Sequence, residues 1–135
     1  MDPVVHFEIP ADDRSRMVDF YSRAFGWTAN QLGPDMGNYV VVKTTETGPD
    51  NFPTNPGRIN GGFFQKTKDN QLPSIVIAVN DIKAAMKKVE GAGGKVLGGQ
   101  SGPGQPDDIP GVGLYASFLD SEGNRLGMLQ PTGKM

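Results

Sequence analysis

The sequence contains no cysteine, and it has only one histidine and one tryptophan among 135 residues. Without cysteine, disulfide bonds, thiol nucleophiles and cysteine-ligated zinc or iron–sulfur centres are excluded. The apolar runs are much shorter than the ~18 residues that a membrane-spanning helix needs. The chain also begins without a basic segment followed by an apolar core, so we expect a cytoplasmic protein with no signal peptide.

Neither sign of charge dominates the chain. Thirteen Lys and Arg residues stand against 15 Asp and Glu residues, which gives a formal net charge of −2 and a pI near 5.3. Such a balance creates no general attraction to nucleic acid or to anionic lipid. No basic run interleaved with aromatic residues, the pattern typical of nucleic-acid binding, is present either. We therefore expect neither a nucleic-acid partner nor a membrane partner.

Glycine and proline are abundant, with 19 and 11 residues respectively, about double their ordinary share. Many of them gather in residues 48–57 and 98–113, between well-patterned segments. These two stretches are predicted to be long loops, and such loops often carry function. Disorder is the alternative for each stretch.

A strand followed by a helix is predicted near the start of the chain. The segment VVHFEI (4–9) alternates between apolar and polar residues like a half-buried strand. Asp12 or Asp13 can cap the next helix, because a carboxylate accepts hydrogen bonds from the free N–H groups of the first turn. We expect the helix to end at Gly26. Its apolar stripe consists of Met17, Phe20, Tyr21, Ala24 and Phe25.

The same pattern recurs later in the chain. A β-branched strand begins at Ser74, Asp81 caps a second helix, and Gly93-Gly94 end it. The caps Asp13 and Asp81 are 68 residues apart. The two copies also end alike, with GGFFQ (61–65) matching LGMLQ (126–130), and each has room for two more strands, at 28–32, 38–44, 95–99 and 114–119. The repeat predicts an α+β fold of two βαβββ modules, residues 1–66 and 72–131, in a single domain spanning 1–135.

The sequence resembles the vicinal oxygen chelate superfamily, which includes glyoxalases, extradiol dioxygenases and bleomycin-resistance proteins. The resemblance lies in HFEIPADD…FYSRAFGW in the first half and in VNDI…GGKV…DSEGNRLGMLQ in the second, and it covers nearly the whole chain. It implies mixed sheets that curl into a cup, helices packed outside and a homodimer.

The resemblance also implies four metal-ligand positions, on the first and last strand of each module. In this sequence they fall on His6, Gly62, Ser74 and Gly127. A protein zinc site needs at least three ligands from His, Cys, Asp or Glu, and only His6 qualifies. Harder ions need several oxygen ligands, which glycine side chains do not offer. We therefore expect no cofactor and disfavour a divalent metal. The two glycines either widen the cup floor, or reflect drift after a metal site was lost or tight strand packing.

His6 and Glu8 are the candidate catalytic residues. They lie two residues apart on one face of the predicted strand, roughly 7 Å from each other. An imidazole that titrates near neutral pH is the usual general base, so the two can form a proton-transfer pair if a substrate bridges them. The alternative is a partly buried histidine hydrogen-bonded to a neighbour.

Several other side chains are candidates for ligand binding. Asn60 shares the inward face with Glu8. Arg125 is two residues before Gly127 and faces inward with it, so it can bind an anionic group of a ligand or remain solvated. Aromatic side chains either line an apolar pocket or belong to the core, namely Trp27, Tyr39, Phe64 and Tyr115. The candidate ligand-binding set is Asn60, Gly62, Phe64, Ser74, Arg125 and Gly127.

These observations predict a protein that binds a small organic ligand in the cup without the four-ligand metal site. One alternative is a metal-dependent lyase, isomerase or dioxygenase of the same superfamily. The other is non-catalytic sequestration of a drug or metabolite. Whether the chain is an enzyme, with a glyoxalase-like lyase or a dioxygenase as candidates, is left open by the sequence.

Overall fold

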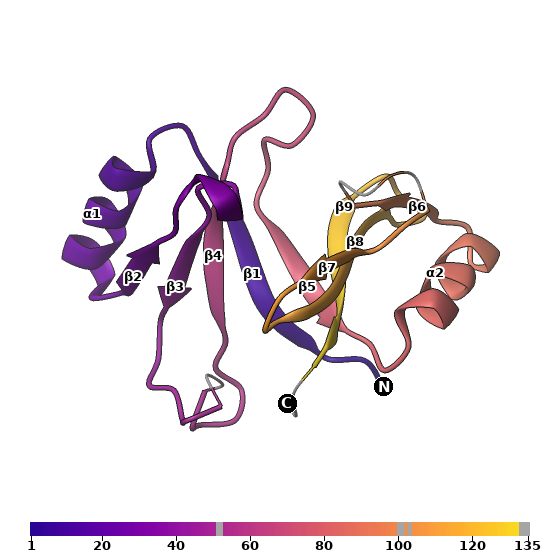
Figure 1. The fold of residues 1–135 in the computed structure, drawn as a ribbon, viewed down its shortest axis with the longest axis horizontal. Coiled ribbons are helices and arrows are strands. Elements are labelled where there is room, and N and C mark those ends of the chain that lie inside the picture. The colour runs from indigo at the N-terminus through magenta and orange to yellow at the C-terminus, as the bar shows by residue number, and fades with distance from the viewer. Residues whose placement is uncertain (51–52, 100–101, 103, 133–135) are drawn as a thin grey trace. The chain divides into compact units, whose positions relative to one another are not determined.

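The computed structural model describes residues 1–50, 53–99, 102 and 104–132. The chain divides into two compact units (Figure 1). We call His6–Pro73 the N-terminal unit, and Met1–Val5 together with Ser74–Met135 the C-terminal unit. The regular structure of the described residues consists of two α-helices, a short 3-10 helix and a mixed sheet of nine strands, which confirms the α+β fold class.

The sheet of the N-terminal unit has the strand order β2-β3-β4-β1. Strand β1 runs parallel to β4, whereas β3 is antiparallel to both β2 and β4. The elements in chain order are β1 (Val4–Ala11), α1 (Arg14–Phe25), β2 (Thr28–Gln31), the 3-10 helix η1 (Pro34–Met36), β3 (Val40–Lys43) and β4 (Asn60–Gln65).

The C-terminal unit repeats this arrangement with the order β5-β9-β8-β6. Strand β5 is parallel to β9, and β8 is antiparallel to its neighbours. The elements are β5 (Ser74–Ala78), α2 (Ile82–Gly91), β6 (Lys95–Gly98), β7 (Asp107–Ile109), β8 (Gly113–Leu119) and β9 (Arg125–Pro131). The predicted repeat of a strand, a helix and three further strands is therefore present, with β7 as an addition.

Strand β7 corrects the prediction of an uninterrupted loop over 98–113. It pairs with the start of β8, but its three residues include two aspartates and show no apolar alternation, so no strand signal is visible in the sequence. Three positions of this stretch, 100, 101 and 103, lie outside the described residues, as do 51 and 52 of the other predicted loop.

Both predicted N-caps are formed. The Asp13 side chain accepts a hydrogen bond from the Arg16 N–H at 3.0 Å, and the Asp81 side chain accepts one from the Ala84 N–H at 3.1 Å. Helix α1 ends at Gly26, whose φ of 76° suits glycine. Helix α2 ends at Gly91, slightly before the predicted glycine pair.

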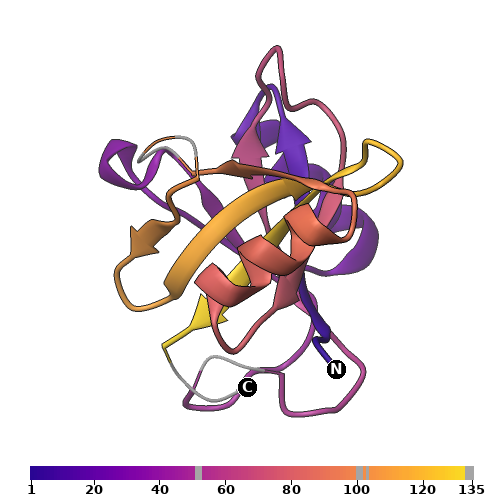
Figure 2. The same cartoon turned by 90° about the vertical axis from the view of Figure 1, so that its right-hand side faces the viewer.

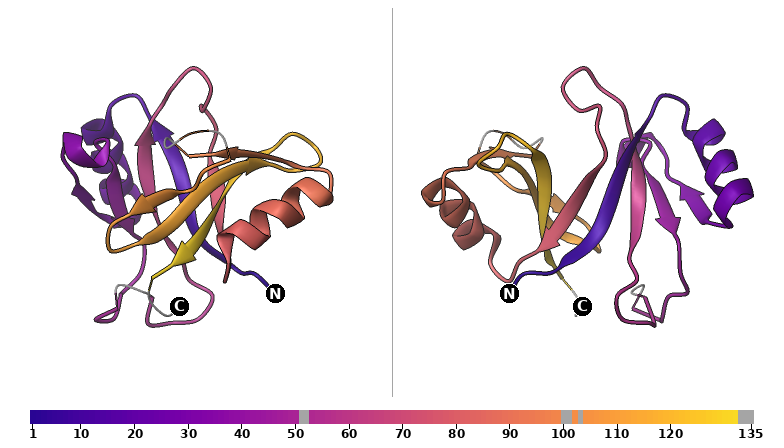
Figure 3. Two further views of the ribbon diagram at one scale, coloured as in Figure 1. Left: turned by 45° about the vertical axis from the view of Figure 1, so that its right-hand side comes forward. Right: turned by 180° about the vertical axis from the view of Figure 1, so that it is seen from behind.

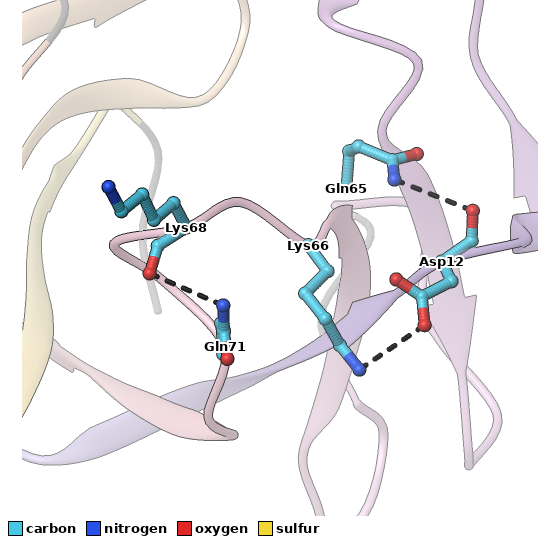
Figure 4. A network of polar contacts seen from close by, with 5 residues as sticks. All are labelled: Asp12, Gln65, Lys66, Lys68 and Gln71. Carbon is cyan, nitrogen blue, oxygen red and sulfur yellow. Dashed lines mark hydrogen bonds and ion pairs between the residues drawn. The ribbon is translucent and has the colours of Figure 1, made fainter.

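The aligned glutamines of the two units both bind the segment that leads into a helix. In the N-terminal unit the Gln65 side chain donates to the Asp12 carbonyl at 3.4 Å, and Lys66 forms a 3.4 Å ion pair with the Asp12 carboxylate (Figure 4). The Gln71 side chain closes the following turn on the Lys68 carbonyl at 3.3 Å. These contacts are largely exposed, so we expect each to contribute little stability.

In the C-terminal unit, the Gln130 side-chain oxygen accepts a hydrogen bond from the Ile82 N–H at 3.0 Å. Ile82 is fully buried at the start of α2. Gln130 therefore satisfies one of the helix N–H groups that have no partner within the helix.

Each helix packs against one face of its own sheet (Figures 2 and 3). Core residues under α1 include Val40, Val42 and Phe63, with Met17 and Tyr21 packed on them. The cluster under α2 consists of Val79, Ile82, Met86, Ala116, Phe118 and Met128. Neither helix is long and apolar enough to cross a membrane within the described residues.

The predicted apolar stripe of α1 is only partly buried. Phe20 and Phe25 are 56% and 64% exposed. The half-buried arc of α1 is centred on Met17, Val18 and Tyr21, so Phe20 lies on its flank, and Phe25 is the last residue of the helix. The two exposed rings contact each other edge to face, with centroids 6.4 Å apart.

Candidate functional site

The face of the N-terminal sheet opposite α1 carries the candidate site. Because side chains alternate along a strand, Phe7 and Ile9 enter the core, and His6 and Glu8 point to the opposite face. His6 pairs with Asn60 and Glu8 pairs with Gly62 in the parallel β1–β4 register. We call this surface the polar face; its residues are His6, Glu8, Tyr39, Val41, Lys43, Asn60, Gly62 and Phe64.

Tyr39 joins the two predicted catalytic residues. Its hydroxyl oxygen lies 2.9 Å from His6 Nε2, and the same hydroxyl donates to Glu8 Oε2 at 3.0 Å. All three side chains are half-buried. The sequence left two interpretations open: a proton-transfer pair bridged by a substrate, or a partly buried histidine hydrogen-bonded to a neighbour. The structure places the phenol of Tyr39 between His6 and Glu8.

The hydrogen bonds determine where the protons of this group lie. A carboxylate only accepts hydrogen bonds, so the Tyr39 proton points to Glu8. His6 must then donate its Nε2 proton to the phenol oxygen. Burial lowers the pKa of His6 from 6.5 to about 4, because desolvation disfavours the charged imidazole. At neutral pH, His6 is therefore an uncharged donor with its proton on Nε2.

Gly62 makes room for the tyrosine. A Cβ atom on residue 62 would overlap the hydroxyl and ring atoms of Tyr39. The C-terminal unit repeats this feature, because a Cβ on Gly127 would overlap Tyr115. In both units the tyrosine lies two residues before the strand residue that pairs with the glycine, Val41 in one and Ser117 in the other.

The two glycines therefore do not leave the open space that a widened floor requires. A tyrosine ring from the neighbouring segment fills the volume above each of them. Glycine inside a strand often marks a close approach, and here the approaching group is a side chain.

The connection from β2 to β3 fixes the position of Tyr39. Arg14, at the start of α1, donates from Nη1 to the carbonyls of Leu32 and Asn38, the latter at 3.0 Å. The Leu32 N–H also donates to the Tyr39 carbonyl at 2.8 Å. Asn38 adopts a positive φ of 56° directly before Tyr39. One guanidinium thus ties both ends of this loop to α1.

Asn60 and Phe64 complete the predicted part of the polar face. The side-chain oxygen of Asn60 accepts hydrogen bonds from the N–H groups of Thr44 and Thr45, at 2.8 and 3.2 Å. Asn60 therefore holds the end of β3, and that oxygen is already used. Phe64 is half-buried on the same face as Gly62. Trp27, by contrast, is a core residue that stacks on Tyr21 with ring centroids 4.6 Å apart.

Comparison with known proteins identifies the family. Residues 4–45 match the family model of the bleomycin resistance protein-like N-terminal region. A glyoxylase-like domain-containing protein of Didymella fabae is 31% identical, over 94% of this chain and 92% of the relative. The chain belongs to the vicinal oxygen chelate superfamily. Residues His6 and Glu8 lie within the matched region.

Two other similarities fit this superfamily. The anthracycline biosynthesis protein DauV of Streptomyces sp. (strain C5) is 30% identical over 87% of this chain, and the chain spans 42% of that relative's length. A structure of Streptomyces coelicolor methylmalonyl-CoA epimerase, in complex with 2-nitronate-propionyl-CoA, has a TM-score of 0.67. It covers 97% of this chain and 95% of its own at 13% identity, which shows a shared fold.

The superfamily's other predicted positions lie in the C-terminal unit. Ser74 is half-buried at the first position of β5, and Gly127 is buried in β9. Arg125 is exposed and donates from Nη2 to the Ser117 hydroxyl at 3.4 Å. Ser117 is buried and donates in turn to the Gly98 carbonyl at 3.1 Å. Arg125 thus has a protein partner on the face that it shares with Gly127.

The residues of the N-terminal unit do not fit the metal centre that the superfamily implies. A metal needs the lone pair of an imidazole nitrogen. Because the Tyr39 hydroxyl donates to Glu8, Nε2 of His6 is the donor in its contact with Tyr39, and only Nδ1 keeps a lone pair. The Tyr39 phenol also fills the space into which a side chain at position 62 would extend. Throughout the described part of the chain, no three His, Asp or Glu residues form a group able to hold a metal ion.

Proposed function

We propose that this chain binds a small organic ligand on its polar face and does so without a chelated metal ion. The observation that carries this proposal is the Tyr39 hydroxyl held between His6 Nε2 and Glu8 Oε2, at 2.9 and 3.0 Å. A half-buried group of hydrogen-bonded polar side chains beside an aromatic ring, here Phe64, is typical of sites for small polar organic molecules.

The ligand class that we propose is an aromatic polyketide-like compound with hydroxyl and ketone oxygens. The support is the similarity to a protein of anthracycline biosynthesis, whose name refers to such compounds. Coenzyme A esters are the second class to test, because a structural neighbour is described with one. Two functions compete with metal-free binding and turnover: metal-dependent catalysis with His6 as a ligand, and sequestration without chemistry. We also propose a homodimer, from membership of the superfamily.

Elemental mass spectrometry of gently purified protein, followed by binding titrations, tests this proposal. We expect substoichiometric metal in wild type and in His6→Ala alike. We also expect saturable binding of 1,8-dihydroxyanthraquinone, measured by its visible absorption, that is unchanged by EDTA. A near-stoichiometric metal that disappears in His6→Ala would contradict the proposal and favour the metal-dependent alternative. Incubation of the bound compound, followed by mass spectrometry, separates turnover from sequestration.

A further inference from the structure

The proposed function leaves open which group meets the ligand and which ligands it selects. We infer that Tyr39 is the ligand-contacting residue of the polar face, that His6 and Glu8 position its hydroxyl, and that the preferred ligand is a neutral compound rather than an anion, with a hydroxyl group that donates to the phenol oxygen. This inference rests on the proposed function and adds the contact residue and the charge of the ligand.

The first argument is the central place of Tyr39. Its hydroxyl contacts both His6 and Glu8, so any ligand that binds to one of these side chains lies next to the phenol. Two bonds to one hydroxyl fix its direction, which reduces the entropy that a ligand contact must overcome.

The second argument is the cost of placing a tyrosine there. Glycine in a strand interior is destabilising by roughly 0.5–1 kcal/mol relative to alanine, and Gly62 is needed because the Tyr39 ring occupies its side-chain space. The β2–β3 loop also has a positive φ at Asn38, and Arg14 binds both ends of this loop. Three local features thus serve one phenol position, and functional sites are where such features concentrate.

The third argument concerns charge. His6 is neutral, whereas the hydrogen bond that Glu8 accepts from the Tyr39 hydroxyl favours the ionised carboxylate, which places a negative charge beside that hydroxyl. Lys43 is on the same face of β3, four residues from Tyr39, or roughly 13 Å along the strand. At that distance its attraction for a group at Tyr39 is largely screened in 0.15 M salt. An anionic ligand at Tyr39 is therefore repelled by Glu8, whereas a neutral one is not.

Matched dye titrations of the full chain test the inference. The probes are neutral 1,8-dihydroxyanthraquinone and anionic anthraquinone-2-sulfonate, and the variants are Tyr39→Phe, Glu8→Gln and Tyr21→Phe. Tyr39→Phe retains the ring above Gly62 and removes only the hydroxyl. Tyr21→Phe makes the same chemical change in the core cluster under α1 and is the control. Circular dichroism and thermal melting check that each variant is folded.

We expect wild type to prefer the neutral dye. Tyr39→Phe should weaken its binding by about tenfold, the effect of one lost hydrogen bond at a partly charged site, and should abolish the shift in its visible absorption. Tyr21→Phe should match wild type in both respects. Glu8→Gln should reduce the preference for the neutral over the anionic dye, a change that a merely structural role of Glu8 would not produce.

The outcomes separate the two proposals. Equal binding and an equal spectral shift in wild type and Tyr39→Phe would overturn the inference and leave the proposed function standing. Preference of wild type for the sulfonate would overturn the charge argument. If wild type binds neither dye nor a coenzyme A ester, the proposed function fails and the inference fails with it.

Discussion

Replacing Gly62 with alanine tests whether Tyr39 is held as the structure shows. The new Cβ would overlap the Tyr39 hydroxyl and ring, so the ring must leave its position between His6 and Glu8. The loss is about 1 kcal/mol for the neutral hydrogen bond and about 1.5–3 kcal/mol for the bond to the carboxylate. Alanine returns roughly 0.5–1 kcal/mol through its lower backbone entropy in the unfolded chain.

The expected net loss is about 2–3 kcal/mol in the free energy of unfolding. For a chain of this size it corresponds to a fall of about 6–12 °C in Tm, measured by circular dichroism and by urea unfolding. Gly91→Ala is the matched control, because a Cβ at this last residue of α2 meets no atom within 4 Å. We expect it to be neutral or slightly stabilising.

A double-mutant cycle with Tyr39→Ala provides the decisive comparison. Once the ring is absent, Gly62→Ala should cost nothing further, because nothing remains for its Cβ to displace. Equal destabilisation by Gly62→Ala in the wild-type and Tyr39→Ala backgrounds would refute this reasoning. An unchanged Tm of the single Gly62→Ala variant would refute it as well.

Two further predictions follow from buried groups. Burial lowers the pKa of His6 to about 4. Between pH ~4 and ~6.5 the unfolded state therefore binds more protons than the native state. The free energy of unfolding should fall by up to about 3 kcal/mol as pH drops through this window. Urea unfolding of His6→Gln should lack this component, and an NMR titration midpoint near 6.5 for the single imidazole would contradict the prediction. Gln130→Ala leaves the Ile82 N–H without its acceptor and should lower the free energy of unfolding by about 1–3 kcal/mol. Gln65→Ala loses only an exposed 3.4 Å contact and should change it by less than about 0.5 kcal/mol. Equal losses of the two variants in thermal unfolding would contradict the different roles of the two glutamines.

The regular elements could be predicted because their signals are local. Alternation placed β1, and a carboxylate before an apolar stripe placed the start of each helix at Asp13 and Asp81. The recurrence of the same spacing in the second half predicted the second unit. The exposure of Phe20 and Phe25 could not be predicted in this way, because periodicity identifies an apolar stripe but not how much of it the sheet covers.

The candidate site was predicted only in part. His6 and Glu8 were found because both lie on one short strand. Tyr39 was missed as their partner because it is 33 and 31 residues away in sequence, and no local pattern reports such a contact. The signal that was available is Gly62, since a glycine within a strand indicates that another group comes close. The identity of that group depends on the loop that Arg14 holds, which only the structure provides.

Strand β1 belongs to both units. Its first two residues, Val4 and Val5, group with the C-terminal unit, and the Pro3 carbonyl accepts a hydrogen bond from the Ala78 N–H at 2.9 Å. From His6 onward the same strand belongs to the N-terminal unit. A gene divided between β4 and β5 would therefore give a first half that carries residues 1–5, which belong to the C-terminal unit. In the second half, strand β5 would lack its neighbour β1. A split version of this protein must graft residues 1–5 onto the second half if that half is to be complete.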